Sequence, residues 1–321
     1  MRSRIASVAC TIIVLTTVSS AAGQGTTLQY HWSAGQEERY RTTQKTVATI
    51  SGMPGADTQT VEQTMAQTTA MKVIAVGADG SATIQQTFEA MRMEMRTPNG
   101  TIVFDSAVKE PPSDPMVAGM AAVLTGMVGE AITIVLKPDG EVVKVEGMGR
   151  IFEKMSAKLP AEVTNSPMVA SLKGALSDEG MRRTVEQSFG LFPDKPVATG
   201  ETWTRTSEVV QPVIGTINTL QTARLQAVET TGGSAMARIG IVVAIKQSAE
   251  APAAGAPMKI TMGEAKGTGE ITFDVTKGRI QRTTMEMDMP MTMAMTTPDG
   301  QFVSMQNSLH TSMVMELLPR Q

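Results

Sequence analysis

The sequence predicts a mainly β protein of the α+β class, built from long, curved antiparallel strands with a helical insert. Residues 24–112 and 200–321 are rich in threonine and alternate between apolar and polar residues with a period of two. This alternation is typical of antiparallel strands with one solvent-exposed face. Turn signals rich in Gly, Pro, Asn and Asp separate the alternating runs. Between 113 and 199 the alternation gives way to helical spacing. We therefore expect either an incomplete barrel or two related sheets, with residues 24–321 packed as one unit.

A short internal repeat bears on the choice between one sheet and two related sheets. Residues 91–100 match residues 291–300 at six of ten positions, with three Met followed by Thr, Pro and Gly. Strands and turns use a limited set of residue patterns, so unrelated hairpins also produce such matches. The repeat therefore indicates either a duplication or two similar hairpins.

Residues 1–23 have the pattern of a secretory signal peptide. Arg2 and Arg4 precede an apolar run from Ile5 to Val18, and small residues follow it. The run is shorter than the roughly 20 residues needed to cross a bilayer, and no later stretch approaches that length, so we expect no transmembrane anchor. Cleavage would also remove Cys10, the single cysteine. The predicted location is the periplasm or the outside of the cell.

The charge balance argues against a nucleic-acid partner. Loss of Arg2 and Arg4 lowers the count of basic residues from 28 to 26 against 31 acidic ones, a net charge of −5, with no long run of either sign. Phosphate binding needs a concentrated positive face. The chain also has 26 Met against 7 Phe, 2 Trp and 2 Tyr, so its core must be built largely from thioethers and branched aliphatic side chains.

The insert, residues 113–199, is predicted to open with a buried helix. Asp114 suits the N-cap position and Pro115 suits the first helical position. The stretch 116–129 contains no charged residue and is too short to cross a membrane. A helix that is apolar on every side is expected to lie buried between other elements.

A hairpin and two more helices complete the predicted insert. The hairpin turns at Asp139-Gly140. One helix spans about Met148 to Leu159 with four apolar residues on one face, and the other spans about Asp178 to Ser188. The four apolar residues are Met148, Ile151, Phe152 and Met155.

The stretch from Thr284 to Thr296 places a methionine at every second position. The residues between them are mostly polar, which predicts a strand with one apolar and one wet face. Pro290 cannot donate a ladder hydrogen bond, so the strand is expected to bend or bulge there, or to lie at an edge. The methionine face is interpreted as plain core or as the lining of a site for an apolar ligand. The candidate lining residues are Met285, Met287, Met289, Met291, Met293, Met295, Met91, Met93, Met95, Met120 and Leu124.

A soft-metal site is the alternative interpretation of this face. Thioether sulfur selects Cu(I) and the chemically similar Ag(I). Alternate residues of a strand lie about 6.6 Å apart, so at most two or three neighbours on one strand could share an ion. The candidate metal ligands are Met287, Met289 and Met291.

No catalytic motif is found, and the sequence predicts neither an enzyme nor a cofactor. Nucleophile elbows, zinc-protease helices, phosphate loops and dinucleotide fingerprints do not occur. His31 and His310 lie at opposite ends of the chain, and a zinc site built on them would still need a third ligand. Three carboxylate pairs are attributed to solvation or to a helix dipole. They are Glu37 with Glu38, Asp178 with Glu179, and Glu286 with Asp288.

Several stretches together resemble a known bacterial family. They include YHWSAGQEERY from Tyr30, KPDGEVVKVEG from Lys137 and LFPDKPVATGETW from Leu191. These stretches are similar to those of exported proteins known only as a domain of unknown function, and the resemblance covers most of the chain after residue 23. It implies an envelope or secreted location and a β-rich fold, and it brings no catalytic residues.

The predicted function is therefore non-enzymatic. We expect an exported binding or structural protein of the bacterial cell envelope, whose partner is a lipid or other apolar small molecule. A methionine-rich protein that binds Cu(I) or Ag(I) is the alternative, and a hydrolase without a recognised motif is a third class. No oligomeric state is predicted.

Overall fold

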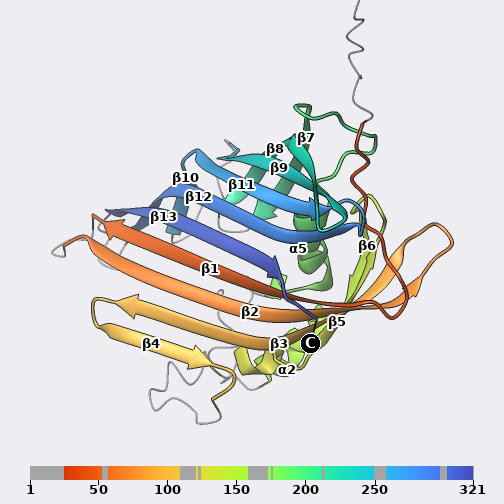
Figure 1. Ribbon diagram of the computed structural model, residues 1–321. Coiled ribbons are helices and arrows are strands. Elements are labelled where there is room, and N and C mark those ends of the chain that lie inside the picture. The colour runs from red at the N-terminus through yellow and green to blue at the C-terminus, as the bar shows by residue number, and fades with distance from the viewer. Residues whose placement is uncertain are drawn as a thin grey trace, which may run out of the picture.

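The fold is described by a computed structural model of the chain (Figure 1). The described residues are 25–52, 57–108, 121, 124–157, 173–174, 176–211, 214–248, 258–296 and 302–320. The predicted signal peptide, the predicted helix start at Asp114 and Pro115, and the candidate residue Met120 lie outside them.

Most of the described chain forms long strands, as the alternation predicts. The first four are β1 (Glu37–Ser51), β2 (Gln59–Val76), β3 (Ala82–Thr97) and β4 (Gly100–Asp105). The next elements are β5 (Ala131–Leu136), β6 (Val142–Glu146), α2 (Met148–Ser156) and α5 (Asp178–Phe189). The remaining strands are β7 (Thr202–Gln211), β8 (Gly215–Thr231), β9 (Ser234–Gln247), β10 (Met258–Met262), β11 (Ala265–Asp274), β12 (Arg279–Thr296) and β13 (Phe302–Leu317).

The strands form one 13-stranded sheet in the order β6-β5-β3-β2-β1-β13-β12-β11-β9-β8-β7, while β4 pairs with β3 and β10 pairs with β12. Each described pairing is antiparallel, and the sheet is not closed because β6 and β7 stand at opposite ends of the order. The predicted mainly β fold with a helical insert is confirmed. The alternative of two related sheets is wrong, because β1 pairs with β13 from Tyr40 opposite Leu317 to Ser51 opposite Gln306.

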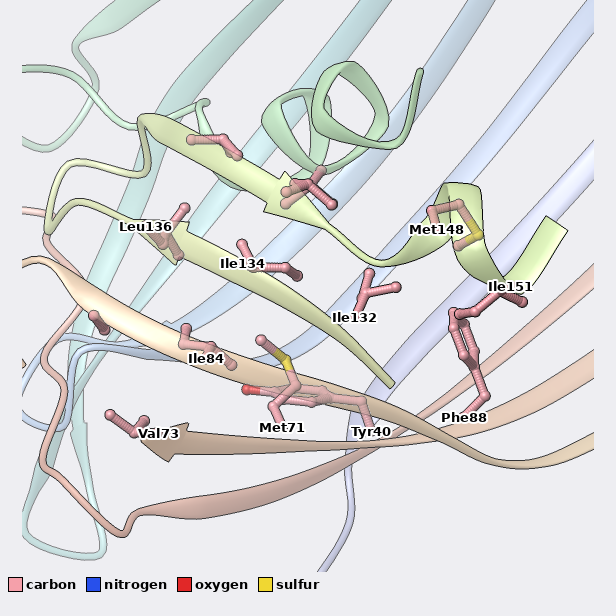
Figure 2. Close-up of a cluster of buried hydrophobic side chains, with 14 of the residues drawn as sticks. Tyr40, Met71, Val73, Ile84, Phe88, Ile132, Ile134, Leu136, Met148 and Ile151 are labelled. Carbon is pink, nitrogen blue, oxygen red and sulfur yellow. The ribbon is translucent and has the colours of Figure 1, made fainter. Parts of the chain in front are cut away.

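One face of the sheet packs on the helices, and we call it the inner face (Figure 2). Tyr40 of β1, Met71 of β2 and Ile84 of β3 belong to one buried cluster with Met148 and Ile151 of α2. Since side chains alternate between the two faces of a strand, these residues show which positions of β1 and β2 point inward. In β3 the alternation shifts by one residue at Glu89, because Thr68 pairs with Ala90 while Thr69 pairs with Phe88. The opposite side is the outer face.

A second buried cluster covers the inner face of β8, β9 and β11. Residues 25–32 and 189–197 contribute Leu28, Tyr30 and Phe192 to it, and the sheet contributes Ile239 and Phe273. The rings of Phe192 and Phe273 meet edge to face with centroids 4.6 Å apart, a favoured aromatic geometry. The chain before β1 and the chain before β7 therefore both serve as cover for the sheet.

The two later helices form where the spacing predicts them. All four residues expected on one face of α2 are buried, and the helix ends at Ser156 rather than Leu159. Ser177 caps α5 by accepting a hydrogen bond of 3.0 Å from the amide of Gly180. Asp178 accepts a bond of 3.1 Å from the amide of Gly149, which links the starts of the two helices.

Part of the uncharged stretch 116–129 is described and is helical, at residues 121 and 124–127. Ala121 is buried in a third cluster with Met91, Met93 and Phe104, and Leu124 packs against this cluster. The described part of this stretch thus packs against the inner face at β3 and β4, in agreement with the expected burial.

Pro290 lies within β12, which continues unbroken from Arg279 to Thr296. The prediction of an edge position is wrong, because β13 pairs along one side of β12 while β11 and β10 pair along the other. The break in strand pairing lies instead on the neighbouring side, between β10 and β11. β10 ends at Met262 and β11 begins at Ala265, and Gly263 donates a hydrogen bond of 2.8 Å to the carbonyl oxygen of Pro290.

Candidate functional site

A row of side chains crosses the inner face at the level of Met285. Directly paired residues of antiparallel strands share a face, so the register identifies the members of the row. From β3 to β9 these are Met93, Met65, Gln44, Met313, Met285, Gly269 and Ile241. Methionines of the N-terminal and C-terminal strands therefore line one continuous surface.

The candidate residues fall into two groups on this face. Met91 and Met93 on β3 are each 4% exposed and lie under the helical segment that contains Leu124, while Met95 is half-buried. On β12, Met285 and Met287 pack against the second buried cluster. Met289, Met291 and Met293 are half-buried, and the side chain of Met295 lies outside the described residues.

Three strands separate β3 from β12, so the two groups lie about 19 Å apart at a strand spacing near 4.8 Å. Methionines that sequence reasoning missed lie on the strands between them: Met65 on β2, and Met305, Met313 and Met315 on β13. Met313 is directly opposite Met285, and Met305 is directly opposite Met293. The alternating pattern around Met313 and Met315 carries the necessary signal, because residues two positions apart lie on the same face of a strand.

The two faces of the sheet differ sharply in charge. In the described parts of β1 to β4 and β9 to β13, the alternation places one charged residue on the inner face, Glu38, and it pairs with Arg279 at the start of β12. The outer face of the same strands carries many charges, including Arg92, Glu94, Lys266, Glu286 and Asp288. The predicted solvation of Glu286 and Asp288 is confirmed, since both are exposed.

Burial changes along the inner face. Ile239 and Phe273 are fully buried beneath residues 25–32 and 189–197. Further along the strands, apolar side chains that point to the same side are only half-buried. These include Met289 and Met293 on β12, Leu309 and Met305 on β13, Ile50 on β1 and Val61 on β2. The inner face thus offers an apolar surface whose accessibility rises away from the helices.

Glu38 departs from the prediction that the carboxylate pairs are solvated. It is 5% exposed, and its Oε1 lies 2.8 Å from Nη1 of Arg279. The hydroxyl of Tyr40 donates to Oε2 of Glu38 at 3.0 Å. Burial and the neighbouring Glu38 carboxylate raise the pKa of Tyr40 well above its usual value, so Tyr40 remains a neutral donor at physiological pH.

This ion pair borders a hollow of about 1050 Å³ near the end of β13, lined by Glu37, Glu89, Lys277, Arg320 and other polar residues. Its lining carries charges of both signs, with four arginine or lysine side chains and three carboxylates. Arg39 and Glu89 form an ion pair of 2.6 Å within it. The hollow is a different environment from the methionine-lined part of the inner face.

The two histidines do not form a shared site. His310 lies on β13 opposite Val47, and its Nδ1 is 2.8 Å from Oδ1 of Asp288. The amide of His31 donates instead to the carbonyl oxygen of Gly278 at 3.1 Å. Within the described ranges, no group of three or more His, Cys, Asp or Glu side chains is placed to hold a metal ion. The described helices are also all too short or too polar to cross a membrane.

Fold and surface define a mainly β protein built on one open antiparallel sheet, whose inner face is almost uncharged over the described parts of β1 to β4 and β9 to β13 while the outer face of the same strands is charged. The chain belongs to DUF6263, a family of unknown function, whose model matches residues 79–280. The resemblance to a family of unknown function is thereby confirmed. No curated protein matches the chain.

Several solved structures are similar to the chain at low identity. Lipovitellin, in a structure of its lipid–protein interactions, aligns at 7% identity and a TM-score of 0.43, over 91% of this chain and 26% of its own. DynF of the dynemicin pathway of Micromonospora chersina aligns at 10% identity and a TM-score of 0.20, over 91% of this chain and 85% of its own. OccK5 (OpdH) of Pseudomonas aeruginosa aligns at 6% identity and a TM-score of 0.19, over 88% of this chain and 99% of its own. The chain spans about a quarter of lipovitellin, and these likenesses carry no argument about function.

Proposed function

We propose that this protein is an exported, non-enzymatic binding protein of the bacterial envelope that holds an apolar, lipid-like ligand against its inner face. The observation that carries the proposal is the contrast between the two faces. Among its described residues, the inner face of β1 to β4 and β9 to β13 has one charged side chain, Glu38, which is paired with Arg279, and methionines and aliphatic side chains line this face.

The energetics of burial favour such a ligand. Each methylene group that leaves water for an apolar surface contributes about 0.8 kcal/mol. A ligand on this face would desolvate few charged side chains, so this gain is not offset by the large cost of burying an unpaired charge. Methionine side chains are flexible and polarisable, and they adapt to ligands of different shape. The half-buried positions of Met289, Met291 and Met293 leave area for this contact.

Native mass spectrometry of the protein purified from its own host provides the first test. A retained lipid adds a mass of several hundred daltons that is lost on denaturation. A fluorescent neutral probe, N-phenyl-1-naphthylamine, provides the second test, because its emission rises in apolar surroundings. We expect saturable binding of the probe and its displacement by long-chain lipids.

A charge placed on each face supplies the matched comparison. Met289→Asp puts a carboxylate on the inner face, and Thr43→Asp puts the same group on the exposed outer face of β1. We expect Met289→Asp to weaken probe binding at least tenfold, whereas Thr43→Asp leaves it within twofold of wild type. Equal binding by both variants, with folding confirmed by circular dichroism, would overturn the proposal.

Soft-metal binding is a second candidate, and the cross-strand methionine pairs favour it. Met285 lies opposite Met313, with Met287 and Met315 two positions away on the same face. Directly opposed residues have Cβ atoms about 5 Å apart, so thioethers from two strands can approach one ion more closely than thioethers from one strand. Titration with Cu(I) against a competing chelator tests this candidate separately.

A further inference from the structure

Three glutamines form a compact group on the inner face between the two methionine groups. Gln44 of β1 lies directly opposite Met65 of β2, and Gln63 and Gln67 stand two positions to either side of Met65. Diagonal neighbours of this kind are separated by about 7–8 Å, which long side chains can bridge. We call Gln44, Gln63 and Gln67 the amide group.

The amide group is surrounded by apolar and hydroxyl side chains. Met93 of β3 is opposite Met65, and Met313 of β13 is opposite Gln44. Thr46 is opposite Gln63, and its hydroxyl lies 3.3 Å from that of Thr311. A chain that lies across the sheet from one methionine group to the other would therefore pass over Gln44 and between Gln63 and Gln67.

The amides are available to a ligand. Gln44 is exposed, while Gln63 and Gln67 are half-buried. The hydrogen bond described for the Gln44 amide is a long one of 3.4 Å to Thr46, so it is easily exchanged for a better partner. Each amide offers both donors and an acceptor and carries no charge.

From this placement, and resting on the proposed function, we infer that the ligand is an acyl chain with an uncharged hydrogen-bonding group, such as an ester or a primary amide, which the amide group recognises. A pure hydrocarbon would displace water from the amides and offer them no hydrogen bond in return, which is costly. A free carboxylate would enter a surface with no unpaired cation among the described inner-face residues, and its charge would be poorly stabilised there.

Three ligands of equal chain length separate these possibilities: dodecane, dodecanamide and dodecanoate. Each is titrated against the complex of the full-length protein with N-phenyl-1-naphthylamine, and the concentration that displaces half of the probe is measured. We expect dodecanamide to displace the probe at a concentration about tenfold lower than dodecane, the effect of one or two net hydrogen bonds. Dodecanoate is expected to be weaker than dodecanamide.

The variant that tests the recognition step is Gln44→Leu combined with Gln63→Leu and Gln67→Leu. It is expected to bind dodecane as well as wild type or better, and to lose the preference for dodecanamide. Gln59→Leu is the matched control, because Gln59 lies on the inner face of β2, the strand of Gln63 and Gln67, and is opposite Ile50. That control should keep the preference.

The possible results have distinct meanings. Equal affinity of wild type for dodecane and dodecanamide, or an unchanged preference in the triple variant, would overturn the inference while leaving the proposed function intact. Tighter binding of dodecanoate than of dodecanamide would overturn it as well. Failure of all three ligands and of the probe itself to bind would instead overturn the proposed function on which the inference rests.

Discussion

Gly269 of β11 lies directly opposite Met285 of β12, and a methyl group placed on Gly269 would come within 3.1 Å of Cε and 3.2 Å of Sδ of Met285. It would also press against the carbonyl oxygen of Thr284. Gly267 has the same relationship to Met287. The two glycines therefore leave the space into which the first methionines of β12 extend.

We predict that Gly269→Ala lowers the free energy of unfolding by about 1–3 kcal/mol, the usual cost of overpacking. Gly149→Ala in α2 is the control, because its added methyl group would meet no atom within 4 Å apart from its chain neighbours and the backbone of its own helix. That change should be neutral or stabilising by up to about 1 kcal/mol, since Ala is the better helix former. Urea denaturation measures both, and a Gly269→Ala protein as stable as wild type would contradict the assigned packing.

The buried ion pair between Glu38 and Arg279 gives a second prediction. The side chains are 4% and 17% exposed, so Arg279→Met would leave the Glu38 carboxylate buried without its cation. Loss of one partner of a buried pair costs about 3–5 kcal/mol. We expect the double variant Glu38→Gln, Arg279→Met to recover part of that loss, as measured by denaturation. A cost below about 1 kcal/mol for Arg279→Met would indicate that the pair is solvated.

Glu179 gives a prediction about pH. Hydrogen bonds from Arg182 and Arg183 lower the pKa of this carboxyl from 4.5 to about 2. Because the folded pKa is the lower one, the stabilisation is complete above the unfolded pKa and is lost as the pH falls from about 5 toward 2. The thermal midpoint of wild type should thus exceed that of Glu179→Gln at pH 7, and the difference should shrink between pH 5 and pH 2.

The difference in thermal midpoint between wild type and Glu179→Gln should also be small, because Glu179 and both arginines are on the surface of α5 and are screened by solvent. Added salt at pH 7 should reduce it further. A difference that persists at pH 2 would show that Glu179 acts through packing rather than through charge.

Replacement of Met287, Met289 and Met291 by Leu separates the two candidate functions. Leu and Met have similar volumes, so each change should cost less than about 1.5 kcal/mol, while three thioether ligands are removed. We expect the triple variant to fold and to bind N-phenyl-1-naphthylamine with unchanged affinity. Stoichiometric Cu(I) binding by wild type that disappears in this variant would favour the metal site instead.

The pairing of β12 with β13 extends the Cu(I) titration to the methionines of β13. Met313 lies opposite Met285, so Cu(I) binding that survives the β12 triple variant should be lost when Met285 and Met313 are also replaced by Leu. Wild-type protein that shows no tight Cu(I) binding would remove the metal interpretation for both strands.

The strands, their two faces and the buried side of α2 follow from the amino-acid pattern alone. Alternation is a local property, because each successive side chain of a strand points to the opposite face. It therefore placed Met289 inward and Asp288 outward without knowledge of any partner strand. The spacing of Met148, Ile151, Phe152 and Met155 defined the buried face of α2 for the same local reason.

The identity of neighbouring strands does not follow from the pattern and is seen only in the folded chain. The pairing of β1 with β13 merges the two predicted sheets, places Met313 opposite Gln44 and buries Glu38 beside Arg279. These contacts join residues more than two hundred positions apart, and local alternation is the same whichever strand lies alongside. Strand order depends on how the whole set of apolar faces can be covered at once, and that is a property of the packed chain rather than of any segment.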